Sequence, residues 1–278
     1  MDCWIHHKVQ ATQGRLVRAS LNTHLLSHCM GGRTRGDPPV FNSQICIILV
    51  KPKHDGNIGA VARTMLNFGV TELRIVNRSI DWSDEVRKRA KNAQTVLDET
   101  TVYETLDQSI ADCSLVVGTS GKREDGKKTA MRHFLTPEEL PLMLQEANGK
   151  VALVFGPEGK GLLNDQLRVC DLLVTIPTWE GYPILNLSHA VSIICYSWFN
   201  DSMDKKPKGA EERLLSPDLR KKLRDEISRL ASVFPTQSHK RRGIEETMVR
   251  VIMRGLPKED EIHRILSVFS KSADSFVK

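Results

Sequence analysis

The chain has 278 residues, of which 40% are hydrophobic and 27% are charged. This composition excludes a disordered chain and supplies a core for one large domain, with or without a small second one. The net charge of +6 favours an anionic partner. We expect no membrane span, because apolar windows fall short of the roughly 18 residues that one needs.

Residues 1–43 contain arginines, are nearly free of acidic residues and lack the apolar core of a secretory signal. We expect a disordered N-terminal extension. Two origins stay open for it: an organelle transit peptide, or an upstream start codon with Met30 as the true start.

The six cysteines are scattered without a Cys-x-x-Cys pair, and several fall inside apolar strand or helix patterns. This usage is typical of reduced core residues in an intracellular protein, so we expect a cytoplasmic location. The histidines, cysteines and aspartates form no cluster with metal-ligand spacing, and we predict no metal site.

Residues 45–50 are a continuous apolar run and predict the first buried strand. Asn57 is expected to cap the helix that follows, which continues through Phe68 and stops at Gly69. On this helix Arg63 shares a face with two glycines.

The two glycines that share a face with Arg63 are Gly56 and Gly59. Because glycine has no side chain, Arg63 is expected to project over a surface that carries no side chains. An ordinary surface arginine and a functional arginine both fit this pattern.

Further strands are predicted at residues 73–76, 115–118, 151–155 and 172–176, where apolar runs alternate with helical segments. The alternation predicts an α/β domain with a mostly parallel sheet covered on both faces. For the basic loop at residues 122–132, a mobile lid and a merely solvated connection both stay open.

The strand at residues 151–155 ends in Gly-Pro-Glu-Gly-Lys-Gly, which places three glycines and a proline around one acid. Ligands in α/β proteins bind at strand ends of this kind. A triphosphate-binding loop is excluded, because no Ser or Thr follows Lys160. Taken alone, the segment also fits an ordinary strand-to-helix connection.

The helix from Asn186 to Phe199 is apolar on nearly every side, so we expect it to be buried in its own domain and partly in a dimer interface. Residues 201–210 have the composition of a linker. Beyond them, residues 211–278 predict a small all-helical domain.

The first tail helix is expected to start at Ser216, with Arg220, Lys221, Lys222 and Arg224 on its polar face. Between the later helices, the basic residues Lys240, Arg241 and Arg242 lie in a predicted turn. A solvated loop and a phosphate contact are the two interpretations of this cluster.

Three segments, residues 55–63, 153–162 and 184–190, together resemble the motifs of the SPOUT methyltransferases, specifically the SpoU or TrmH branch that methylates ribose 2′-hydroxyls of RNA. The resemblance covers residues 45–199. It implies a SPOUT fold with a C-terminal trefoil knot, S-adenosylmethionine as cofactor and an active site formed across a homodimer.

The helical tail is similar to that of the TrmJ tRNA methyltransferases within this branch. This similarity implies tRNA as partner and the ribose of nucleotide 32 in the anticodon loop as target. Methylation of ribosomal RNA or another tRNA ribose, and a non-catalytic RNA-binding protein of the same fold, are the alternatives.

The resemblance implies catalytic roles for four residues: Arg63 stabilises the forming alkoxide, Asn57 and Asn186 orient substrate or cofactor, and Glu158 holds the glycine-rich loop. It also implies a cofactor site built from backbone groups at three strand ends, which comprises Thr119, Ser120, Gly121, Gly156, Pro157, Glu158, Ile176, Pro177, Leu185, Asn186 and Leu187.

The chain departs from its relatives at Ile184, where many of them carry a serine before the Leu-Asn pair. A catalytic or orienting hydroxyl is therefore excluded at this position.

Overall fold

The computed structural model describes residues 44–121, 134–144, 147–203 and 212–277, all of which belong to the unit of the chain that spans residues 38–278. The predicted N-terminal extension, the basic loop at 122–132 and most of the linker at 201–210 lie outside the described residues.

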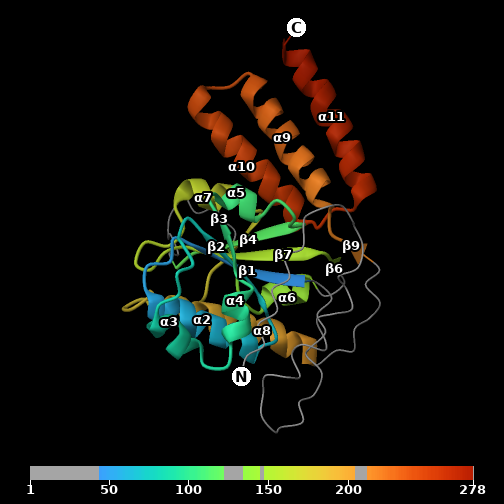
Figure 1. The fold of residues 1–278 in the computed structure, drawn as a ribbon. Coiled ribbons are helices and arrows are strands. Elements are labelled where there is room, and N and C mark those ends of the chain that lie inside the picture. Colours follow the sequence, from blue (N-terminus) through green and yellow to red (C-terminus); the bar gives the residue numbers. More distant parts are fainter. Residues whose placement is uncertain (1–43, 122–133, 145–146, 204–211, 278) are drawn as a thin grey trace, which may run out of the picture. The chain divides into compact units, whose positions relative to one another are not determined.

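A seven-stranded sheet forms the centre of this unit, with the strand order β3-β2-β1-β7-β4-β8-β5 (Figure 1). Every pairing in it is parallel, which confirms the predicted α/β class. The strands are β1 (Gln44–Val50), β2 (Glu72–Val76), β3 (Thr101–Tyr103), β4 (Leu115–Thr119), β5 (Phe134–Leu135), β7 (Lys150–Phe155) and β8 (Leu172–Val174).

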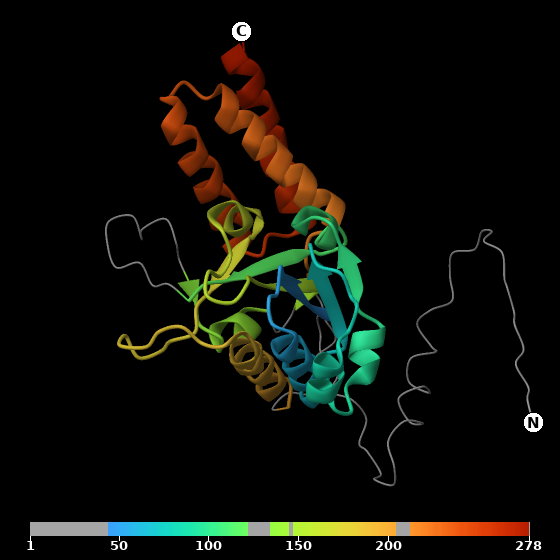
Figure 2. The same ribbon diagram turned by 60° about the vertical axis from the view of Figure 1, so that its left-hand side comes forward.

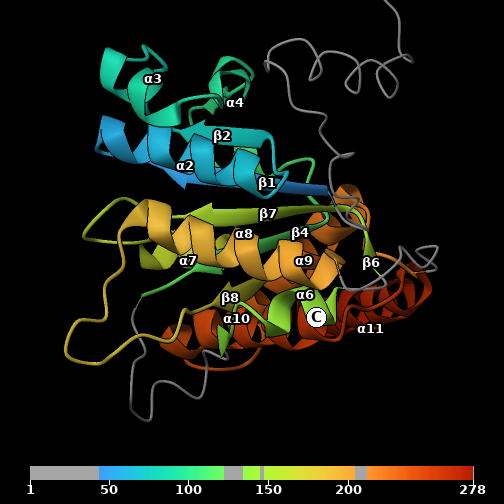
Figure 3. The same cartoon turned by 90° about the horizontal axis from the view of Figure 1, so that it is seen from below.

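Helices cover the sheet on both faces (Figures 1 and 3). One face carries α2 (Asp55–Asn67), α3 (Asp84–Ala90), α4 (Gln94–Asp98), α6 (Glu139–Met143) and α8 (Leu187–Met203). The other carries α5 (Leu106–Ser109) and α7 (Asn164–Val169), with α9 (Pro217–Val233), α10 (Ser238–Arg254) and α11 (Glu259–Val277) beyond them. A second, two-stranded sheet pairs β6 (Ala147–Asn148) with β9 (Glu212–Arg213).

Successive side chains of β1 enter two separate cores because they point to opposite faces of the sheet. Ile45 and Ile47 belong to the core beneath α2 and α8, whereas Cys46 and Ile48 belong to the core beneath α5 and α7. This double burial explains why the strand is an unbroken apolar run in the sequence.

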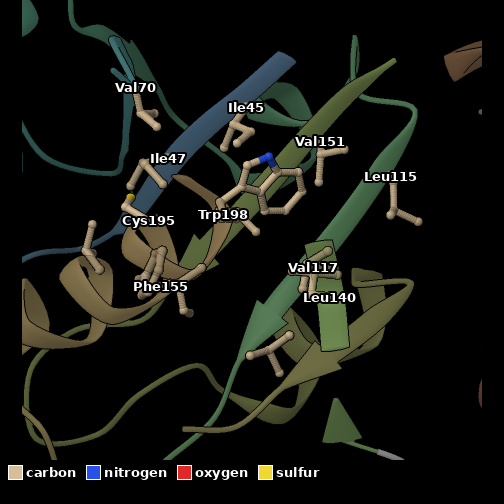
Figure 4. Close-up of a cluster of buried hydrophobic side chains, with 14 of the residues drawn as sticks. Ile45, Ile47, Val70, Leu115, Val117, Leu140, Val151, Phe155, Cys195 and Trp198 are labelled. Atoms are coloured by element: carbon tan, nitrogen blue, oxygen red, sulfur yellow. The ribbon is translucent and has the colours of Figure 1, made fainter. Parts of the chain in front are cut away.

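Helix α8 packs its buried side chains on the centre of the sheet. Trp198 and Cys195 lie over Ile45, Ile47 and Val151 (Figure 4). Burial raises the pKa of the Cys195 thiol to about 12, so this group stays protonated and unreactive at neutral pH. The other described cysteines are likewise free and buried, as the sequence predicts.

Two predictions about where helices begin are wrong. Helix α2 begins at Asp55 with His54 at its N-cap, so Asn57 lies inside the first turn and does not cap it. Asp55 is favourable there, because a negative charge stabilises a helix N-terminus. Helix α10 begins at Ser238, so the basic cluster lies in its first turns; lysine and arginine are good helix formers, and no proline interrupts them.

The tail helices pack on one another and on the sheet domain (Figure 2). Ser216 caps α9 by accepting a hydrogen bond from the Leu219 amide, as predicted. The prediction that Arg220 and Arg224 lie on a polar outer face is wrong. Only 6% of Arg220 and 22% of the Arg224 side chain are exposed, and both guanidinium groups bind the buried Asp171. Within the described residues, no helix is long and apolar enough to cross a membrane.

Candidate functional site

A cavity of about 290 Å³ opens at the carboxyl ends of the central strands. Its walls come from the end of β4, the loop after β7, helix α7 and the segment that leads into α8. Parallel strands place ligand sites at this edge.

The cavity brings together most of the residues predicted to bind a cofactor. The ones that line it are Thr119, Ser120, Gly121, Gly156, Pro157, Glu158, Ile176, Leu185 and Leu187. Pro177 and Asn186 are not among the lining residues. Helix α7 contributes Asn164 and Leu167, which could not be predicted because no motif in the sequence marks them.

The loop after β7 folds tightly on itself. A Cβ atom on Gly156 would lie 2.1 Å from the backbone carbon of Gly161, so a side chain there would meet the loop itself. Gly159 and Gly161 have φ angles of 81° and 67°, where glycine is strongly favoured. The Gly161 amide closes the turn on the Pro157 carbonyl over 2.9 Å.

A chain of hydrogen bonds joins three motifs at the rim of this loop. The Asn57 side chain donates from Nδ2 to Oε1 of Glu158 over 2.8 Å. Its Oδ1 accepts from Nδ2 of Asn186 over 3.1 Å. The Asn186 Oδ1 in turn accepts from the Ser188 amide over 2.9 Å, which caps helix α8.

The carboxylate sets the direction of this chain, because it can only accept. Asn57 must therefore present its NH₂ to Glu158 and its oxygen to Asn186, which leaves the Asn186 oxygen for Ser188. Three distant segments are thus held in one arrangement.

Glu158 is held in its ionised form. Burial works to raise its pKa, but hydrogen bonds from Asn57 and from the backbone amides of Lys53 and His54 outweigh burial and lower the pKa below its ordinary value. A carboxylate bound in this way is a weak base, which fits a positioning role better than proton abstraction.

Arg63 is exposed and is not among the residues that line the cavity. The expected bare surface beside it is absent: a Cβ atom on Gly59 would lie 2.2 Å from the Val86 carbonyl oxygen. One on Gly56 would lie 2.7 Å from the Glu85 carboxylate. The two glycines therefore permit the close approach of α3 to α2.

The basic cluster on α10 divides into groups with different surroundings. Lys240 is exposed, whereas Arg242 binds Asp165 of α7 with a 3.0 Å distance between Nη2 and Oδ1. Arg241 is half-buried. In the part of the chain that the structure describes, no group of His, Cys, Asp and Glu is arranged to hold a metal ion.

Comparisons with known proteins extend these observations. The model of the SpoU rRNA Methylase family matches residues 44–196. A tRNA (cytidine-2′-O-)-methyltransferase TrmJ of Methanocaldococcus jannaschii is 44% identical over 162 residues, which are 58% of this chain and 70% of that protein. The tRNA (cytidine/uridine-2′-O-)-methyltransferase TrmJ of Salmonella typhimurium is 40% identical over 154 residues, which are 55% of this chain and 62% of that protein.

Among solved structures, the crystal structure of TrmJ from Z. mobilis ZM4 superimposes with a TM-score of 0.64 at 26% sequence identity. The match covers 81% of this chain and 97% of that one, so it extends beyond the sheet domain into the tail helices.

Proposed function

Since the chain belongs to the SpoU rRNA methylase family, we propose that it methylates a ribose 2′-hydroxyl of tRNA with S-adenosylmethionine as methyl donor. The observation that carries the proposal is the meeting of all three motifs at one cavity, in a chain whose relatives are named as tRNA 2′-O-methyltransferases.

The residues of the cavity suit this cofactor. Strand ends and a glycine-rich loop supply backbone amides and carbonyls, and Leu162, Leu167 and Ile176 supply an apolar wall for an adenine ring. The cofactor, when bound, supplies an electrophilic methyl group on a sulfonium.

In the transfer, the ribose oxygen forms a bond to the methyl carbon while the bond from that carbon to sulfur breaks. The hydroxyl proton leaves to solvent, and S-adenosylhomocysteine is the second product. The chain's own part is to orient the hydroxyl and to stabilise negative charge on its oxygen.

We assign charge stabilisation to Arg63, whose guanidinium is a planar cation with several N–H donors. Because Arg63 is exposed and away from the lining of its own cavity, we propose that it serves the cavity of a second copy in a homodimer. The Tyr196 side chain on α8 is 55% exposed and beside Phe68, which supports α8 as part of that interface.

Nucleotide 32 in the anticodon loop is the proposed target, and the cytoplasm the proposed location. The trefoil knot and a separate tRNA-binding role for residues 211–278 are proposed on the resemblance to SPOUT and TrmJ enzymes.

Incubation of the full chain with labelled S-adenosylmethionine and total RNA, followed by mapping of the methylated nucleotide, tests the proposal. We expect label on the ribose of tRNA nucleotide 32. Label confined to ribosomal RNA would overturn the proposal that tRNA is the substrate. Cofactor binding without any methyl transfer would favour a non-catalytic RNA-binding protein.

A further inference from the structure

Helix α7 lies between the cavity and the tail helices and offers a different stripe of side chains to each. Asn164 and Leu167, three residues apart, line the cavity. Asp165 and Arg168, with the same spacing, contact α10. Residues three apart share one side of a helix, so one short helix serves both partners.

The side-chain contacts with α10 are charged. Arg168 donates from Nε to Oε1 of Glu246 over 2.5 Å, and Arg242 donates from Nη2 to Oδ1 of Asp165 over 3.0 Å. Arg168 and Glu246 are both mostly buried, with 27% and 22% of their side chains exposed, so water screens this pair only in part.

The tail also caps the end of α7. The last carbonyl groups of a helix have no partner within it. Here the Arg168 carbonyl accepts from Nη2 of Arg224 over 2.5 Å, and the Val169 carbonyl accepts from Nη2 of Arg220 over 3.1 Å. A helix of six residues is not stable by itself, so these bonds from α9 matter to its position.

Asp171 fixes the two arginines in turn. Its carboxylate is fully buried and accepts from Nε of Arg220 over 2.6 Å and from Nη1 of Arg224 over 2.8 Å. It also accepts from the Val116 amide of β4 over 2.9 Å. Arg220 and Arg224 thus each use one nitrogen to bind Asp171, which is itself bonded to the sheet, and use Nη2 to bind a carbonyl group at the end of α7.

We propose that Arg224 and Glu246 are positioning residues for the cofactor cavity: through α7 they hold the wall formed by Asn164 and Leu167. The inference rests on the proposed function for the identity of the ligand. It gives the tail helices a part in cofactor binding, in addition to any contact with RNA.

The test compares variants of the full-length chain by calorimetric titration with S-adenosylmethionine, well below the melting temperature of each. Arg224→Met removes the bonds to the Arg168 carbonyl and to Asp171, and it leaves Asp171 with Arg220 and the Val116 amide. Glu246→Gln removes the charge opposite Arg168. The matched control is Arg229→Met, on the same helix, whose guanidinium binds Asp274 of α11.

We expect Kd for S-adenosylmethionine to rise about fivefold or more in Arg224→Met and Glu246→Gln, and to stay unchanged in Arg229→Met. In methyl-transfer assays KM for the cofactor rises while kcat at saturating cofactor changes little, a split that general destabilisation does not produce. Arg224→Lys restores part of the affinity, because one ammonium group replaces a fork that binds two partners.

Unchanged Kd in folded Arg224→Met and Glu246→Gln would overturn the inference and leave the proposed function intact. Failure of the unmodified chain to bind S-adenosylmethionine would instead overturn the proposed function.

Discussion

Asn57 and Glu158 share a 2.8 Å hydrogen bond although 101 residues separate them in the chain. The bond ties the start of α2 to the loop that forms one wall of the cavity. Because Asn57 also accepts from Asn186, this single amide fixes the relative positions of all three motifs.

Asn57→Asp is expected to abolish methyl transfer and to lower the free energy of unfolding by about 1–3 kcal/mol. The new carboxylate has no donor for Glu158 and repels it. Single-turnover methyl transfer and chemical denaturation measure the two effects. Asn92→Asp, at an exposed position in the loop between α3 and α4, is the control and stays near wild type; equal behaviour of the two variants would contradict the role of Asn57.

The lowered pKa of Glu158 predicts a pH dependence of stability. Folding favours the ionised carboxylate, so its contribution is complete above its ordinary pKa of 4.5 and is lost as pH falls through the lower folded value. In Glu158→Gln this contribution is absent. Denaturant unfolding of both proteins from about pH 3 to pH 7 should show that the free energy of unfolding falls less below pH 4.5 in the variant. If the free energy of unfolding of the two proteins falls in parallel, Glu158 does not contribute to the pH dependence.

The glycines of the loop after β7 are not equivalent. Gly156→Ala places a Cβ atom against the loop's own backbone. We therefore expect the cavity to be distorted, the stability of the protein to fall and S-adenosylmethionine binding to be lost. A Cβ atom on Gly159 meets nothing within 4 Å, and Gly159→Ala costs only the strain of its positive φ, about 1 kcal/mol. Thermal unfolding and calorimetric titration of the two variants check this, and similar losses in both would refute it.

Arg63→Ala is expected to abolish methyl transfer while S-adenosylmethionine still binds, because Arg63 is not among the residues that line its own cavity. If Arg63 acts in a second copy, a mixed dimer of Arg63→Ala and Gly156→Ala subunits retains one intact site and regains part of the activity. Sedimentation verifies the dimer, and turnover of the mixed preparation is the measurement. Near-normal turnover of Arg63→Ala alone would remove Arg63 from the mechanism.

Lys240→Gln is expected to weaken tRNA binding and to reduce the salt dependence by about one phosphate contact. Lys240 is exposed on the first turn of α10, where it can reach a phosphate. Lys271→Gln, exposed on α11, is the matched control. Filter binding over a range of salt concentrations compares the slopes, and identical slopes for both variants would place the RNA elsewhere.

The central strands were predictable because both of their faces are buried, which makes them continuous apolar runs. Strands β3 and β5 were not, since Thr101–Tyr103 is a short and partly exposed edge and Phe134–Leu135 has only two residues. Neither leaves a pattern long enough to distinguish from a loop.

The roles of residues whose partners lie far along the chain were also mispredicted. Helical periodicity assigns Arg220 to a polar face, but it cannot show that the buried carboxylate of Asp171 lies opposite. Likewise, local preferences favour Asn57 as a cap, whereas its partner Glu158 belongs to a segment far along the chain. Most of the residues that the resemblance assigned to the cofactor line the cavity, because its motifs mark the loops. The resemblance passed over α7, which has no motif.

The strand order also governs how the chain folds during synthesis. Strand β1 pairs with β2 on one side and with β7 on the other, and β7 ends at Phe155. Between the exit of β2 and that of β7 from the ribosome, one edge of strand β1, which is apolar from Ile45 to Val50, has no partner. At about 5–20 residues per second this interval lasts several seconds, so a nascent chain is expected to need chaperone protection until β7 emerges.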